Sequence, residues 1–130
     1  MSVLRSIAAV VLGYVVFAIS AGLLFRILGA NPHAPQSPGL MAGSVAYGMA
    51  FAFLGGLAAL RLAPRRPGLH AALVSLLIAA GATASLLASP VDDAKWSQRA
   101  ALLLMAPSAL LAGRLSTGRT PGAPPDRPTG

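Results

Sequence analysis

Cysteine and glutamate are both absent from this 130-residue chain, and aspartate occurs only at Asp92, Asp93 and Asp126. Without cysteine the chain has no disulfide, no thiolate metal site and no thiol nucleophile, although this absence says nothing about compartment. Charged residues make up only 10% of the chain, whereas soluble domains carry about 25%. Soluble helices use glutamate freely on water-facing surfaces, so a helical chain without it has little such surface to cover.

Long runs without any charged residue fill most of the remaining sequence. A bilayer core of roughly 30 Å needs about 20 apolar helical residues to cross it. The sequence therefore predicts an all-α, polytopic membrane protein, a bundle of four transmembrane helices over residues 3–28, 38–62, 68–89 and 94–115. The first run exceeds the roughly 7–15 residues of a signal-peptide core, which favours a retained helix. Residues 116–130, rich in Ser, Thr, Gly and Pro, predict a disordered cytoplasmic tail.

Prolines and capping residues mark the predicted helix ends. Ser37 followed by Pro38 is typical of a helix start, because the hydroxyl caps the helix and proline needs no backbone donor there. Asp93 is the expected cap of the fourth helix. Pro107 falls inside that helix and should distort the turn before it, with Ser108 helping to satisfy the freed backbone.

The distribution of basic residues predicts the orientation of the bundle. The net charge is +7. Threading four helices places Arg5, Arg61, Arg65, Arg66, Arg114, Arg119 and Arg127 on one side, and Arg26, Lys95 and Arg99 on the other. By the positive-inside rule the first side is cytoplasmic, so both termini lie there. Many arginines, with much Ala, Gly and Pro, indicate a GC-rich genome and favour a bacterial inner membrane. The basic residues form no contiguous patch, so no nucleic-acid partner is predicted.

Small residues recur at four-residue steps on two of the predicted helices. The steps comprise Ser44, Gly48, Ala52 and Gly56, and then Ala71, Ser75, Ala79 and Thr83. Small side chains let membrane helices approach closely, so these steps predict packing faces. An alanine-rich chain also produces such steps by composition, but glycine is costly in a helix without a neighbour. The expected partners are the lipid bilayer, further copies of the chain or another membrane protein.

The two halves of the chain show a weak internal similarity. A shift of 63 residues places Ala8, Val11 and Leu23 on Ala71, Val74 and Leu86. Duplication of a two-helix unit and chance matching in an Ala/Leu-rich chain both explain this pattern.

Polar residues gather where the second side of the membrane is expected. This candidate outer-rim cluster comprises Arg26, His33, Asp92, Asp93 and Arg99. Two interpretations of this cluster are a metal site and an anion site. Helix capping by the aspartates and snorkelling of the arginines is the favoured one. No catalytic residue, metal ligand or cofactor site is predicted.

The functional prediction is correspondingly general. Ion-coupled transporters usually place an ionisable residue inside the membrane, and these predicted spans contain none at depth. The leading hypothesis is a non-enzymatic membrane protein that acts through helix packing with itself or another membrane component. The alternatives are a small transporter or channel subunit, and an outer-rim binder or enzyme for an anionic lipid or small anion.

Overall fold

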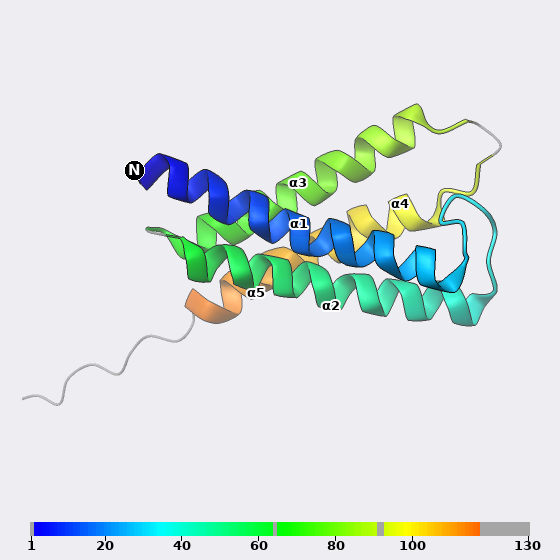
Figure 1. Ribbon diagram of the computed structural model, residues 1–130, viewed down its shortest axis with the longest axis horizontal. Helices are drawn as coiled ribbons and strands as arrows, with labels where there is room; N and C mark the ends of the chain where they lie inside the picture. The colour runs from blue at the N-terminus through cyan, green and yellow to red at the C-terminus, as the bar shows by residue number, and fades with distance from the viewer. Residues whose placement is uncertain (1, 64, 91–92, 118–130) are drawn as a thin grey trace, which may run out of the picture.

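A computed structural model describes residues 2–63, 65–90 and 93–117 of the chain, and the described part is all-helical (Figure 1). Its elements are α1 (Ser2–Leu28), α2 (Pro38–Leu62), α3 (Pro67–Ala88), α4 (Trp96–Ala100), the π-helical η1 (Ala101–Met105) and α5 (Ala106–Thr117). The helices α1, α2 and α3 are long and apolar enough to cross a membrane. The all-α and multi-pass membrane predictions are confirmed to this extent. The predicted tail from residue 118 lies outside the described residues.

The elements run back and forth between two ends of one bundle (Figure 1). The loop end holds residues 29–37, which join α1 to α2, and the described part of the α3–α4 connection. The terminal end holds the start of α1, the α2–α3 turn and the end of α5. The segments α4, η1 and α5 follow one another along α2 and α3. Helices α1 and α3 diverge toward the loop end.

The predicted start of α2 is confirmed. Ser37 is extended, with φ −60° and ψ 148°, and its hydroxyl accepts a hydrogen bond from the Leu40 N–H at 3.3 Å. Pro38 occupies the first turn, where its missing donor costs nothing. At the end of α1, Gly29 has φ +60°, a conformation that glycine adopts without steric cost. These residues fix where the loop end begins and ends.

The predicted cap of the fourth segment is wrong. Helix α4 begins at Trp96, its N-cap residue is Lys95, and no side chain bonds to the cap position. The preceding backbone is held from elsewhere, since the Ala94 N–H donates to the His33 carbonyl at 3.0 Å. Asp93 itself lies before the helix, in a turn where its N–H donates to the Pro90 carbonyl at 3.2 Å. Asp92 lies outside the described residues.

The distortion expected from Pro107 takes the form of a π turn. In η1 the Ala106 N–H bonds to the Ala101 carbonyl, one residue further back than in an α-helix. The Ser108 hydroxyl donates to the Leu104 carbonyl at 2.8 Å. From the neighbouring helix, Ser75 donates to the Ala106 carbonyl at 2.6 Å and ties α3 to this turn. Two hydroxyl groups thus bond to backbone carbonyls next to the proline inside the bundle.

Close backbone contacts hold the core together. A Cβ at Gly55 would overlap the Gly13 carbonyl of α1, and a Cβ at Gly56 would overlap the Ala109 carbonyl of α5. The largest fully buried side chains are only Ile78 and Val74, and much of the remaining core is alanine. The bundle is therefore held by tight backbone approach rather than by bulky side chains, as expected for helices packing in lipid.

Candidate functional site

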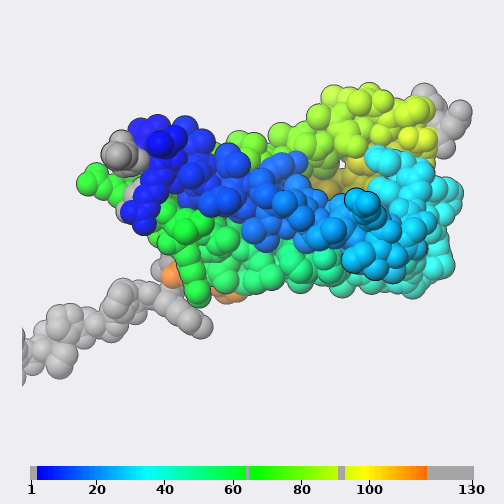
Figure 2. Space-filling model, in the orientation of Figure 1, coloured from blue at the N-terminus to red at the C-terminus, as the bar shows by residue number. Residues whose placement is uncertain are grey.

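A cleft opens between α1 and α3 beyond the point where the helices touch. Near the middle of the bundle, Gly13 approaches Gly55 and Val74 too closely to admit a side chain of its own. Toward the loop end α1 and α3 separate, and the space between them is about 340 Å³. Figure 2 shows this hollow between the two helices, with α4 visible at its floor. Its volume is at the lower end of the range of small-molecule sites in proteins.

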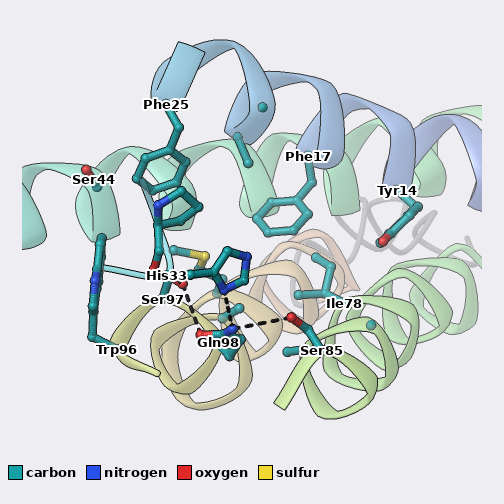
Figure 3. A pocket seen from close by; sticks show the side chains of 17 residues that line it. Tyr14, Phe17, Phe25, His33, Ser44, Ile78, Ser85, Trp96, Ser97 and Gln98 are labelled. Carbon is teal, nitrogen blue, oxygen red and sulfur yellow. Dashed lines mark hydrogen bonds between the residues drawn. The ribbon is translucent and has the colours of Figure 1, made fainter. Parts of the chain in front are cut away.

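Aromatic and aliphatic side chains form most of the cleft wall. Helix α1 contributes Tyr14, Phe17 and Phe25, α3 contributes Ile78, and η1 contributes Met105. These α1 residues follow one another at helical spacing, so one stripe of the helix forms the wall (Figure 3). The ring of Phe25 lies 6.1 Å from that of Trp96 in an edge-to-face arrangement, which closes the wall at the loop end.

A polar network surrounds Gln98 at the loop end of the cleft. The side chain is only 4% exposed. Its Nε2 lies 2.8 Å from His33 Nδ1, 3.2 Å from the Ser89 hydroxyl and 3.3 Å from the Ser85 hydroxyl. Its Oε1 lies 3.1 Å from the Ser97 hydroxyl (Figure 3). Gln98 thereby joins α3, α4 and the α1–α2 loop through a single buried amide.

Further hydrogen bonds attach the α1–α2 loop to α4. The Ser97 hydroxyl donates to the Pro32 carbonyl at 2.8 Å, and the Trp96 indole N–H donates to the Ala34 carbonyl at 2.9 Å. Within the loop, the His33 N–H donates to Asn31 Oδ1 at 2.9 Å. These bonds hold His33 over the cleft, where Figure 3 shows its ring between Gln98 and Phe17.

Several polar groups lining the cleft are left without a partner by the described residues. With Gln98 oriented as in the structure, His33 Nδ1 accepts a hydrogen bond, so a neutral ring carries its proton on Nε2. Neither that Nε2–H nor the Tyr14 hydroxyl makes a hydrogen bond to another described residue. The Ser44 hydroxyl is buried and also unpaired. A buried polar group without a partner is costly, and a ligand that bonds to it removes that cost.

No Asp, Glu, Lys or Arg is found among the described residues that line the cleft. These residues carry aromatic, aliphatic, hydroxyl, amide and imidazole groups. A charged ligand would therefore lack a counter-ion inside the cleft, which disfavours it strongly in a low-dielectric setting. The described residues also contain no group of three or more potential metal ligands.

The described members of the predicted outer-rim cluster are Arg26, His33, Asp93 and Arg99, since Asp92 lies outside the described residues. Arg26 and Arg99 are exposed and do not line the cleft, while Asp93 is half-buried in the α3–α4 connection. Of these described members, only His33 lines the cleft. Sequence reasoning missed Gln98 and Ser97, although a glutamine inside a predicted span of so apolar a chain is a usable signal.

The predicted packing residues lie at different depths. In α2, Ser44, Gly48, Ala52 and Gly56 are all buried, with Gly48 against Met105 and Gly56 against Ala109. In α3, Ala71 is buried, Ser75 and Ala79 are half-buried and Thr83 is exposed. The buried residues of α3 are His70, Ala71, Val74, Ile78 and Ala82. The small face of α2 is thus occupied by other segments of the same chain.

No protein-family model, curated protein or solved structure matches this chain. The chemistry of the cleft is consequently the basis for a functional proposal.

Proposed function

We propose that this protein binds a neutral amphiphile, drawn from the surrounding bilayer, in the cleft between α1 and α3. One observation carries the proposal: a largely apolar cleft between two helices long enough to cross a membrane has no Asp, Glu, Lys or Arg among its described lining residues, and contains the unpaired Ser44 hydroxyl and the His33 Nε2–H. A bilayer lipid can enter sideways, keeping its chains in an apolar setting while its head bonds to the polar network. Binding of this kind needs no catalytic group.

The wider architecture of the proposal is a four-span bundle in a bacterial inner membrane with both termini cytoplasmic. The segments α4, η1 and α5 together would supply the fourth span. Arg5, Arg61, Arg65, Arg66 and Arg114 belong to the terminal end, and Arg26, Lys95 and Arg99 to the loop end. The excess of basic residues at the terminal end supports a cytoplasmic location for it.

Single cysteines test this orientation cleanly, because the natural chain has no background thiol. We expect an impermeant maleimide to label Asn31→Cys in intact spheroplasts, and to label Arg65→Cys only after the membrane is permeabilised. The unmodified chain serves as the control and should remain unlabelled. Labelling of Arg65→Cys in intact spheroplasts would reverse the orientation and place the cleft near the cytoplasm.

Blocking the cleft tests ligand binding directly. Gly22 lines the cleft, and a Cβ there meets no atom within 4 Å, so Gly22→Phe adds a ring without breaking the bundle. A ligand at about 100 times its Kd should stabilise the unmodified protein by about 2.7 kcal/mol. We expect neutral lipids extracted from bacterial membranes to raise the thermal midpoint of the unmodified protein, but not that of Gly22→Phe.

The matched control is Gly43→Phe. Gly43 lies in α2, a Cβ there also meets nothing within 4 Å, and the residue does not line the cleft. This variant should respond to neutral lipid as the unmodified protein does. Equal responses from Gly22→Phe and Gly43→Phe would refute binding in the cleft.

Other functions have less support. Association with further copies or another membrane protein through the α2 small residues competes with their contacts inside the bundle. A transporter or channel subunit needs a polar route along the bundle, yet the buried polar residues of the described part are few: Ser20, Ser44, His70, Gln98 and Ser108. An anion or anionic lipid at the rim would contact Arg26 and Arg99, which stand apart from the cleft.

A further inference from the structure

We infer that the ligand of this cleft is a neutral lipid whose head bears a carbonyl oxygen, and that this oxygen accepts the hydrogen bond of His33 Nε2–H. The inference rests on the proposed function, because it specifies the ligand of the same cleft. Two classes of membrane lipid share this chemistry: isoprenoid quinones, with ring carbonyls, and acylglycerols, with ester carbonyls.

Hydrogen-bond direction determines which head group fits. Gln98 Nε2 is a donor, so His33 Nδ1 at 2.8 Å must accept, and the proton of a neutral ring is on Nε2. Gln98 therefore presents His33 to the cleft as a donor. The Tyr14 hydroxyl, deeper in the cleft, is free to donate as well. Two such donors call for an acceptor-rich ligand, and a carbonyl is an acceptor that carries no charge.

Charge excludes the commoner lipid heads. Among the described residues of the lining, a phosphate head would find no Lys or Arg to balance its negative charge, and an ammonium head would find no Asp or Glu. Arg26 and Arg99 are exposed and outside the cleft, so they do not supply the missing counter-charge. The lining is thus selective for neutral lipids.

The shape of the cleft matches a small head with a chain below it. Phe25, His33 and Trp96 lie at the loop end, whereas Tyr14 and Ile78 lie deeper. From Phe25 to Tyr14 the wall of α1 extends about 16 Å at 1.5 Å per residue. This length is about half of a roughly 30 Å bilayer core, so the cleft reaches from one membrane surface to its middle. The aromatic and flat alanine-glycine walls favour a thin ring or a single chain over a bulky head.

The test uses purified protein in detergent and two pairs of probes, each consisting of a carbonyl compound and an analogue of similar size without the carbonyl. Decylbenzoquinone is compared with decylbenzene, and dioctanoylglycerol with its dioctyl ether analogue. Binding is followed by the shift in thermal midpoint. For the quinone it is also followed by quenching of Trp96, the only tryptophan in the chain and a residue of the cleft wall. We expect at least one carbonyl probe to bind about tenfold more tightly than its partner.

His33→Asn isolates the proposed bond. The asparagine Oδ1 can replace Nδ1 as the acceptor for Gln98, but the variant has no donor at the position of Nε2. Affinity for the carbonyl probe should fall to that of the carbonyl-free analogue, while the midpoint of the ligand-free protein stays unchanged. Gln36→Ala, which removes a bond to Asn31 within the same loop, controls for loop perturbation and should leave affinity unchanged.

The outcomes are distinguishable. If carbonyl probes and their analogues bind equally, or if His33→Asn binds the carbonyl probe normally, the inferred head group is wrong while lipid binding in the cleft stands. If all four probes bind weakly and Gly22→Phe changes nothing, both proposals fail. Preference for the quinone over the acylglycerol identifies the ring carbonyl as the ligand group, and the reverse identifies the ester. If phosphatidylcholine is the only lipid that competes for the cleft, the bound molecule is an ordinary boundary lipid and the inference is wrong.

Discussion

Gly56→Leu is expected to prevent the bundle from forming, whereas Gly43→Leu should leave it folded. A Cβ at Gly56 would overlap the Ala109 carbonyl of α5, and a backbone atom of a packed helix cannot move aside as a side chain can. Overpacking of a core costs about 1–3 kcal/mol where side chains adjust, and a helix-to-helix backbone clash should exceed that range. At Gly43 the added side chain enters open space, and loss of a helical glycine is favourable by up to about 1 kcal/mol.

The measurement is thermal and SDS unfolding in detergent, followed by far-ultraviolet circular dichroism and size exclusion. A graded series sharpens the result. At Gly48 the opposing atoms are the flexible end of Met105, so Gly48→Ala should cost less than Gly56→Ala. Equal midpoints for Gly56→Leu and Gly43→Leu would show that α2 does not pack on α5 as described. Substitutions at these glycines cannot by themselves test self-association, because they disturb the folding of a single chain.

Gln98→Leu should destabilise the loop end by about 3 kcal/mol. The substitution removes every bond made by a side chain that is only 4% exposed, and leaves the half-buried His33 Nδ1 and the Ser85 and Ser89 hydroxyls without the donor they share. Each buried polar group left unpaired costs about 1–3 kcal/mol. The α1–α2 loop should then separate from α4 and become sensitive to protease.

Limited proteolysis at the loop and the thermal midpoint together measure this effect. Gln98→Glu preserves the shape of the side chain but has no N–H to donate, so it should destabilise the loop end as well. Gln36→Leu provides a comparison, because Gln36 makes one exposed bond in the same loop. If Gln98→Leu unfolds at the same temperature as Gln36→Leu, the network contributes nothing to stability.

Sequence reasoning located the helices closely because their signals are local. Charge-free runs set the lengths, and Ser37, Pro38 and the prolines around Arg65 set the boundaries, which agree with α1, α2 and α3 to within about two residues. The Asp93 cap was wrong for a non-local reason. The backbone there bonds to His33, far away along the chain, and this bond outweighs the local capping preference.

The cleft and its network could not be predicted in the same way. Gln98 meets His33 across 65 positions of sequence, and nothing in either neighbourhood indicates that pairing. The cleft itself depends on the angle at which α3 leaves α1 beyond the Gly13 contact, which is a property of three packed helices together. The small residues of α2 were predicted from spacing alone, but which segment would cover them was not.

The π turn changes the direction in which Gln98 points relative to Ala109. In an unbroken α-helix Gln98 and Ala109 would point in nearly the same direction, differing by about 20° at 100° per residue. The wider turn of η1 holds one extra residue and rotates everything before it by about 100° relative to α5. Ala109 can then abut α2 while Gln98 turns to α3 and His33. One extra residue in the turn is therefore enough to give a single apolar helix two segments whose packing faces point in different directions.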